Sequence, residues 1–298
     1  MKRKRRNAAR PTAPVRIGIH TSIAGRLEQA ADRARQLGCD AFQIFSANPR
    51  VWSNALLNPV DADAFRRRQQ ALGLAPLVIH DNYLINLASA QPVTRSRSIQ
   101  AFHGEIKRAL ALDADYLVMH PGSAVGLPRR QARANVVFGL RQALKGARLN
   151  GLQILLENTA GQGSALGARL EELAELLAAL PELNLGVCLD TAHLFAAGYD
   201  IRTPAGLEET LAQVHTTVGL DRVKVIHTND SKAACGARVD RHQHIGKGKI
   251  GREAFRRLLH HRTLAGKTFI LETPIERKGD DRRNLQLIRR LAGQPTRS

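Results

Sequence analysis

The chain has 298 residues, 43% of them hydrophobic, which is enough apolar material for one large core. Lysine and arginine total 45 against 26 acidic residues, and the resulting formal net charge of +19 suits a polyanion such as nucleic acid, or a generally basic proteome. No segment approaches the ~20 apolar residues of a membrane span, and three widely spaced cysteines suggest reduced thiols rather than a disulfide framework. We therefore expect a cytoplasmic protein with reduced thiols and no membrane partner.

The first fourteen residues, MKRKRRNAARPTAP, are basic and include no apolar core of the kind a secretion signal needs. We expect a flexible tail over residues 1–14, followed by a single folded domain over residues 15–298. The tail either adds affinity for phosphate or is simply solvated, and its composition fits both interpretations.

After the tail, short β-prone runs alternate with longer amphipathic segments. The predicted strands are 16–20, 41–45, 75–80, 115–120, 152–157, 184–190, 222–227 and 267–272. The predicted helices are 27–37, 62–72, 98–112, 131–149, 170–180, 206–218 and 252–260. Alternation of strand and helix periods in the hydrophobic pattern indicates parallel βαβ units. Eight such units close into an α/β fold of the (β/α)8, or TIM barrel, type.

Seven of the eight predicted strands end in a histidine or an acid. These residues are His20, His80, His120, Glu157, Asp190, His227 and Glu272. All strands of such a barrel are parallel, so their last side chains meet at the C-terminal rim, where barrel enzymes have their active sites. One histidine there would more often be structural, but seven convergent side chains predict a site. Imidazoles and carboxylates without thiolates are typical ligands of hydrolytic zinc or manganese.

Two further segments add candidate ligands. We expect the chain to turn into a loop after Asp190, so that Asp190 and His193 diverge toward neighbouring ions. Asp240 and His242 are two residues apart and would project to the same side of an extended chain. Three nearby glycines over residues 246–251 suggest a loop close to another group, with phosphate as one candidate.

Long motifs across the chain resemble one known family. They include HDNYLINLAS (80–89), HPGS (120–123), ENTAGQGS (157–164), CLDTAHLFAAGYD (188–200), HTNDSKAACGARVDRHQHIGKGKIG (227–251) and LETP (271–274). Together with GIHTSIAGRLEQA and FQIFSANPRVW near the N-terminus, they are similar to the endonuclease IV family of apurinic/apyrimidinic endonucleases, over roughly residues 15–292. Arg26, Ala124 and Lys247 depart from the usual family residues, and none of them stands at a ligand position.

The resemblance implies three zinc ions on the barrel rim, although manganese or iron could occupy some positions. The first ion would be held by His80, His120 and Glu157. The second would be held by Glu157, Asp190, His227 and Glu272, so that Glu157 bridges two ions and is the catalytic carboxylate. The third would be held by His193, Asp240 and His242.

The same resemblance implies a DNA substrate and its contacts. A family member would hydrolyse the phosphodiester 5′ to an abasic site in duplex DNA, leaving a 3′-hydroxyl and a 5′-deoxyribose phosphate. The DNA-contacting positions map to Asn48, Arg50, Tyr83 and Leu84. Tyr83 and Leu84 would fill the gap left by the extruded nucleotide, although Leu84 could equally be a core residue. We expect the enzyme to act as a monomer.

Two other functions fit part of the pattern. A sugar isomerase or epimerase of the xylose isomerase type would use Glu157, Asp190, His227 and Glu272 for one metal site. It would have no use for the five additional ligands or for the positive charge. A metal-free DNA-binding module would leave the clustered carboxylates repelling one another with no cation between them.

Overall fold

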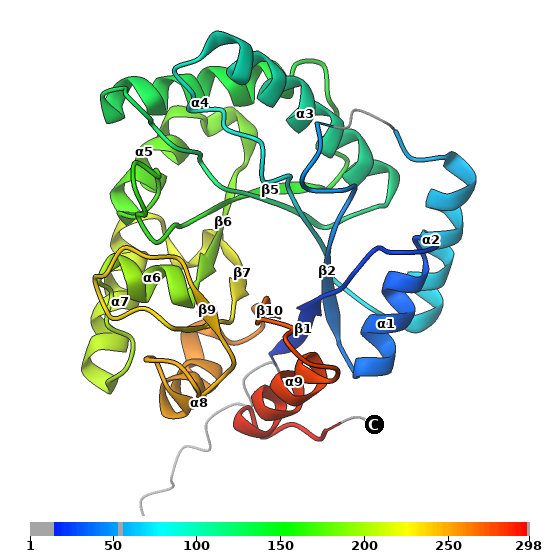
Figure 1. Ribbon diagram of the computed structural model, residues 1–298, viewed down its shortest axis with the longest axis vertical. Coiled ribbons are helices and arrows are strands. Elements are labelled where there is room, and N and C mark those ends of the chain that lie inside the picture. The colour runs from blue at the N-terminus through cyan, green and yellow to red at the C-terminus, as the bar shows by residue number, and fades with distance from the viewer. Residues whose placement is uncertain (1–14, 53–55, 297–298) are drawn as a thin grey trace, which may run out of the picture.

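Eight parallel strands close into a barrel in the computed structural model, which describes residues 15–52 and 56–296 (Figure 1). Around the barrel the strand order is β1-β10-β7-β6-β5-β4-β3-β2. The strands are β1 (Arg16–His20), β2 (Ala41–Phe45), β3 (Leu77–His80), β4 (Tyr116–Met119), β5 (Gln153–Glu157), β6 (Gly186–Asp190), β7 (Val223–His227) and β10 (Thr268–Leu271). The predicted TIM barrel is confirmed, whereas the predicted tail, residues 1–14, lies outside the described residues.

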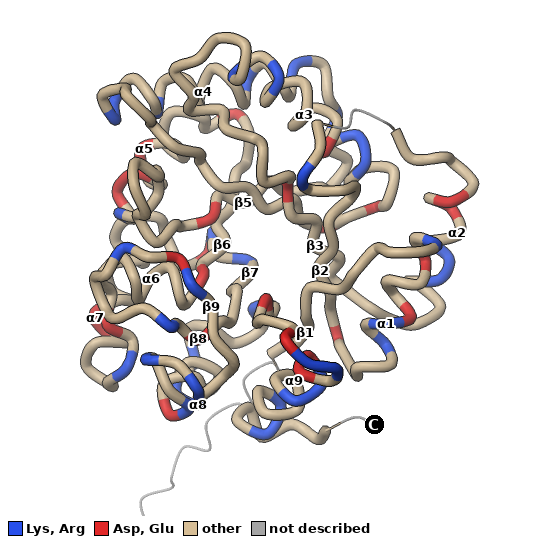
Figure 2. Tube along the Cα trace, viewed as in Figure 1, with Lys and Arg blue, Asp and Glu red and all other residues tan. Residues whose placement is uncertain are grey.

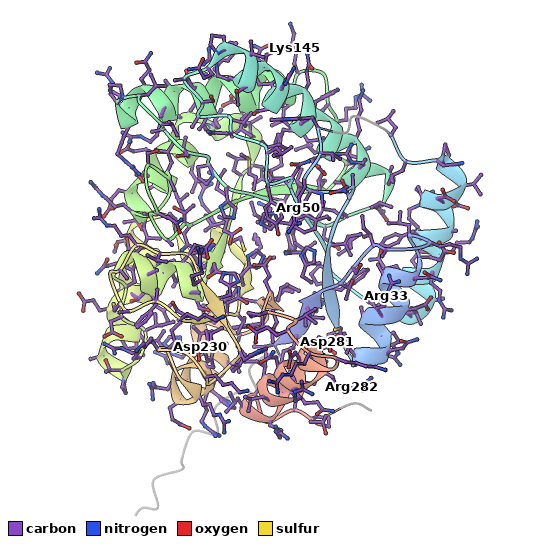
Figure 3. The ribbon with its side chains drawn as sticks, viewed as in Figure 1. Arg33, Arg50, Lys145, Asp230, Asp281 and Arg282 are labelled. Carbon is purple, nitrogen blue, oxygen red and sulfur yellow. The ribbon has the colours of Figure 1, made fainter. Side chains whose placement is uncertain are left out.

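Helices form a ring around the barrel (Figure 1). They are α1 (Gln29–Leu37), α2 (Pro59–Leu72), α3 (Pro92–Ala111), α4 (Arg129–Ala143), α5 (Leu170–Ala179), α6 (Thr191–Ala197), α7 (Pro204–Thr217), α8 (Arg252–His260) and α9 (Asp280–Leu291). Three short 3-10 helices, η1 (Pro181–Leu183), η2 (Leu220–Arg222) and η3 (Arg262–Leu264), precede strands. Figure 2 shows that lysine and arginine are spread over this ring. Arg33 lies on α1, Lys145 just after α4 and Arg282 on α9 (Figure 3).

The ends of α2 illustrate how local sequence sets these elements. Asn58 precedes the helix and its side chain accepts a hydrogen bond from the Val60 N–H at 2.9 Å, and Pro59 occupies the first turn. Gly73 ends the helix in the left-handed conformation, with φ 63°. The prediction that α4 extends to residue 149 is wrong. The helix ends at Ala143 because the chain turns through Gly146, with φ 76°, toward β5.

Two apolar cores hold the barrel together. The larger one lies between the strands and the surrounding helices. The smaller one fills the barrel interior with Ala41, Val78, Val118, Leu155, Cys188, Val225 and Ile270. Side chains of the described residues therefore fill the barrel interior and leave no channel, and the site lies at one end, as is usual for this fold. Gly18 in β1 permits the close approach of β2, since a Cβ there would lie 2.0 Å from the Ala41 carbonyl oxygen.

A two-stranded antiparallel sheet lies beside the mouth of the barrel and consists of β8 (Asp230–Ser231) and β9 (His242–Gln243) (Figure 1). All three cysteines are free thiols, with Cys39 and Cys188 buried and Cys235 partly exposed. Among the described residues, no helix is both long enough and apolar enough to cross a membrane.

Candidate metal centre

Glu157, the last residue of β5, is surrounded by histidines at the C-terminal mouth of the barrel. The residue is 0% exposed. Its Oε2 lies 3.1 Å from the Nε2 atoms of His80 and His120. Its Oε1 lies 2.9 Å from Nδ1 of His227 and 3.3 Å from Nδ1 of His193. Four imidazoles from different parts of the chain thus face one buried carboxylate, which is a donor set suited to divalent transition metals.

Three groups of potential ligands share Glu157, and in each the ligand atoms lie within 4.8 Å of one another. One of them, Glu157, Cys188 and His227, includes a thiol whose pKa burial raises well above its ordinary value, so that it is protonated at neutral pH. The other two groups contain only imidazoles and carboxylates. The first of these is His80, His120 and Glu157, and the second is Glu157, Asp190, His227 and Glu272. These are the sets that the sequence predicts for the first two ions. His120 and Glu272 stand one residue beyond β4 and β10 rather than within the strands.

A third group lies beside the other two. His193, His242 and Asp190 offer ligand atoms within 4.8 Å of one another. The Asp240 carboxylate lies 3.2 Å from His193 Nε2 and 3.5 Å from His242 Nε2. The structure therefore brings together the three residues predicted for the third ion, and it adds Asp190, which lies 3.6 Å from His242.

The chain continues from β6 directly into α6, so the predicted loop after Asp190 is wrong. Asp190 is the N-cap of this helix, and its Oδ1 accepts a hydrogen bond from the His193 N–H at 2.8 Å. Residues three apart share a helix face, which keeps His193 above the same side of the barrel as Asp190. The start of the helix therefore fixes the positions of Asp190 and His193 relative to each other.

Three buried amides hold the ligands, and none was predicted from the sequence. Asn229 Nδ2 donates to Asp190 Oδ2 at 2.6 Å. Asn158 Oδ1 accepts from the Asp190 N–H at 2.7 Å, and its carbonyl lies 2.9 Å from His193 Nδ1. Gln43, in the middle of β2, contacts Glu272 and His227. The only signal for Gln43 was a polar residue in an otherwise apolar strand.

His20 is the one strand-end residue that joins none of the groups above. Its Nδ1 lies 3.0 Å from Gln43 Nε2 and 4.0 Å from Glu272 Oε1. Burial lowers the pKa of His20 to about 4, against an opposing effect of Glu272, so the ring is neutral at physiological pH.

The charges of the centre stabilise one another. Burial favours the neutral form of Glu272, but His227 nearby lowers its pKa to about 2. Burial also favours the neutral form of Asp240, but the hydrogen bond with His193 lowers the pKa of this carboxyl to about 2. Burial disfavours the charged form of His193, yet Asp190 and the hydrogen bond with Asp240 raise its pKa well above the ordinary value. The carboxylates of Glu272 and Asp240 are therefore ionised at neutral pH.

A cavity of about 650 Å³ opens above the centre. Its polar wall includes His80, His120, Glu157, His193, Asp240, His242 and Glu272. Its apolar wall includes Phe45, Tyr83, Ile85 and Ile275. A pocket lined by both potential metal ligands and apolar side chains can hold a small ligand against a few polar atoms.

The predicted DNA-contact residues stand on the loops after β2 and β3. Asn48 and Arg50 are exposed, and Arg50 lies near the middle of the view down the barrel (Figure 3). Tyr83 is 66% exposed, and its ring packs edge-on against the ring of Phe45, with 5.1 Å between the ring centroids. Leu84 is half-buried. The structure places these side chains at the mouth, and their contact with DNA stays a prediction.

The two loops are tied to each other. The Tyr83 N–H donates to the Pro49 carbonyl at 3.2 Å, and Asn82 Nδ2 donates to the Val51 carbonyl at 2.7 Å. Asn82 is itself buried, and its Oδ1 accepts from the Leu84 N–H at 2.7 Å. The rim on this side is thus one connected surface.

The glycine-rich loop after β9 approaches Asp230 rather than a phosphate. Asp230 is fully buried, and its carboxylate accepts from the N–H groups of Gly246, Gly248, Ile250 and Ser231 at 2.8–3.0 Å. A Cβ on Gly248 would lie 2.4 Å from Asp230 Oδ1. The amides that could have held a phosphate are therefore occupied within the protein.

Comparison with known proteins gives the family of the chain. The family model for xylose isomerase-like TIM barrels matches residues 31–291. A protein of Solibacter usitatus named "Probable endonuclease 4" is 50% identical over 282 residues, which cover 94% of this chain and 97% of that protein. A Chloroflexus aurantiacus protein of the same name is 46% identical over 278 residues, 93% of this chain and 98% of its own.

Two solved structures show what the fold resembles. Endonuclease IV from Thermus thermophilus superposes with a TM-score of 0.84 at 39% identity, covering 93% of this chain and 99% of that one. A D-psicose 3-epimerase superposes with a TM-score of 0.67 at 15% identity, covering 94% of this chain and 100% of its own, a similarity of fold alone. The chain therefore belongs to the endonuclease 4 family, within the xylose isomerase-like TIM barrels.

Proposed function

We propose that this protein is a zinc-dependent DNA repair endonuclease that hydrolyses the phosphodiester 5′ to abasic sites in duplex DNA. Membership of the endonuclease 4 family makes the chain a DNA-cleaving hydrolase. The observation that supports the finer proposal is the convergence of nine acidic and imidazole side chains, grouped around Glu157, at the mouth of the barrel, where seven of them line one cavity.

The residues of the centre fit divalent cations. His242 Nε2 is buried without a hydrogen-bond partner, although carboxylate oxygens of Asp240 and Asp190 lie 3.5 and 3.6 Å away. An imidazole nitrogen facing two carboxylates across such a gap is accounted for by an ion between them. Nitrogen and oxygen ligands without thiolates suit zinc, and manganese or iron could occupy some positions.

We assign three ions to the three groups. His80, His120 and Glu157 would hold the first, and Glu157 would also serve the second, together with Asp190, His227 and Glu272. His193, Asp240 and His242 would hold the third. When bound, the ions supply Lewis acidity that offsets the negative charge of a phosphodiester transition state and lowers the pKa of water. Glu157 is central because its charge would let two cations lie close together.

The protein itself contributes shape and charge to substrate selection. An abasic nucleotide has no base to unstack, so its extrusion from a duplex costs less than flipping an intact nucleotide. The apolar wall of the cavity would accept the bare sugar, and Tyr83 with Leu84 would fill the gap in the duplex. Arg50 and Asn48 would contact the backbone, with the net charge of +19 adding non-specific affinity. We expect the enzyme to act as a cytoplasmic monomer.

A duplex carrying one abasic site tests the reaction. We expect one cut on the 5′ side of the lesion, with products ending in a 3′-hydroxyl and a 5′-deoxyribose phosphate, resolved by gel sizing against chemical standards. A chelator should abolish the cut and added zinc should restore it. Cleavage that survives complete metal removal, or a cut on the 3′ side, would contradict the proposal.

Metal analysis separates this function from the sugar epimerase alternative. We expect elemental analysis of the undialysed protein to find three zinc ions per chain, because all three groups are formed in the structure. A single ion per chain, combined with epimerisation of a ketohexose and no DNA cleavage, would favour the epimerase.

A further inference from the structure

Gln43 lies inside the barrel directly beneath the second group of ligands. The residue is 0% exposed, and its amide makes three polar contacts. Its Nε2 donates to Glu272 Oε1 at 2.6 Å and lies 3.0 Å from His20 Nδ1. Its Oε1 lies 2.8 Å from His227 Nε2. One amide thus links two ligands that come from different strands, β7 and the end of β10.

The orientation of this amide is fixed by its neighbours. An ionised carboxylate only accepts hydrogen bonds, so the Gln43 NH₂ group must face Glu272. The reversed amide would place two oxygens 2.6 Å apart and lose the hydrogen bond. His20 fits this orientation because its Nδ1 lies 3.0 Å from Gln43 Nε2, where it can accept the second Gln43 N–H. The oxygen of Gln43 therefore faces His227.

This orientation in turn selects the tautomer of His227. The Gln43 oxygen has no hydrogen to give, so His227 must carry its proton on Nε2 and donate it. The lone pair of the neutral ring is then on Nδ1. That atom faces the other ligands, 2.9 Å from Glu157 Oε1 and 3.3 Å from Glu272 Oε2.

We propose that Gln43 is a positioning residue of the metal centre, which holds His227 in the Nε2–H tautomer and fixes the carboxylate of Glu272. This inference rests on the proposed function, because it assumes that a metal occupies the second group. Partners that orient metal ligands in this way typically contribute about 10–100-fold to metal affinity. Gln43 would not touch the substrate, so its effect is on metal retention rather than on the chemical step.

A substitution that removes the hydrogen bonds to Glu272 and His227 tests this role. We expect Gln43→Leu to weaken zinc binding about 10–100-fold in competition with a chromophoric chelator, and excess zinc to restore cleavage. Val78→Ala is the matched control, because Val78 is also 0% exposed and pairs with Gln43 in the β2–β3 register, yet is apolar. The control should lose stability but keep the wild-type affinity for zinc. Unchanged affinity in Gln43→Leu, or an equal loss in Val78→Ala, would overturn the inference.

A measurement on the unaltered protein does not depend on the folding of any variant. Nitrogen NMR of the zinc-loaded, histidine-labelled wild type reports which ring nitrogen of His227 carries hydrogen. We expect the proton on Nε2, and a proton on Nδ1 would refute the assignment. If the wild type binds no zinc at all, the proposed function fails and this inference with it. If it binds zinc but Gln43→Leu binds equally well, only the role of Gln43 fails.

Discussion

Side chains on the floor of the site stand at or next to strand ends, whereas those on the rim stand on loops. On the floor, Glu157, Asp190 and His227 end strands that are hydrogen-bonded to their neighbours in the closed barrel. On the rim, Gly248 and Tyr83 belong to loops whose shape depends on a few buried polar side chains, such as Asp230 and Asn82. Many backbone hydrogen bonds between strands hold the floor in place, whereas a few side-chain hydrogen bonds hold each rim loop.

This difference predicts two kinds of defect. A change on the floor should remove chemistry while leaving the fold and the DNA-binding surface in place, since neighbouring strands hold the backbone. A change on the rim should alter stability or substrate preference, because the loop itself would move. The four variants below test this division, in order of decreasing effect.

The largest effect is expected from Glu157→Gln on the floor. The substitution keeps the size of the side chain but removes the charge that would let two cations approach each other. We expect the rate of cleavage to fall about 100-fold or more, with duplex binding largely retained. Glu175→Gln makes the same chemical change on α5, where the side chain is 53% exposed, and should leave cleavage unaffected. Cleavage within tenfold of wild type at full metal loading would contradict the role of Glu157.

The next effect is expected from Gly248→Ala on the rim. The new Cβ would lie 2.4 Å from Asp230 Oδ1 and 2.5 Å from the Ser231 carbonyl oxygen, so the loop must shift. We expect the free energy of unfolding, measured by chemical denaturation, to fall by about 1–3 kcal/mol. Lys249→Ala changes an exposed side chain in the same loop and should have little effect. Equal stability of the two variants would show that the loop tolerates displacement.

A smaller and more selective effect is expected from the double variant Tyr83→Ala, Leu84→Ala. Without the side chains that would fill the gap in the duplex, binding of an abasic duplex should weaken about tenfold, because a stacking contact is lost. A single-stranded abasic substrate, which has no stack to part, should be affected much less. Val60→Ala removes an equally exposed apolar side chain, 70% against 66% for Tyr83, from α2 and serves as the control. Equal losses on both substrates, or a loss of zinc, would refute the role of a wedge.

The smallest effect is expected from Asp280→Asn, and it depends on pH. Asp280 Oδ2 accepts from the N–H groups of Glu276 and Arg277 in the rim loop after β10. The hydrogen bond from Arg283, followed by that from Arg277, lowers the pKa of Asp280 from 3.8 to about 2. A carboxyl whose pKa is lowered by folding stabilises the protein above its unfolded pKa, and this stabilisation is lost as pH falls through the folded value.

We therefore expect Asp280→Asn to lower the Tm at about pH 6 and to match wild type near pH 2, if both are still folded there. Thermal unfolding followed by circular dichroism across this range gives the comparison. A difference in Tm that does not shrink with acidification would mean that charge on Asp280 is unimportant for the loop.

The floor was easier to predict from sequence than the rim. An apolar run that ends in His80, Glu157 or Asp190 indicates both the strand and its functional end, because parallel strands must converge. The helix α6 was missed because its seven residues are nearly all buried and show no amphipathic period. The role of Asp230 was missed because it depends on amides about 16–20 residues further along the chain. Gln43 is neutral, and its contacts lie up to 229 residues away in sequence.

The packed interior of the barrel has a kinetic consequence. Seven apolar side chains close the barrel beneath the ligands, so ions, water and sugar reach the floor through the mouth. A duplex lying across that mouth, as in the proposed function, would also shut the route by which ions leave. Metal release into a chelator from the enzyme–DNA complex should then proceed no faster than DNA dissociation. The time that metal release takes would therefore set an upper limit on the residence time of the duplex.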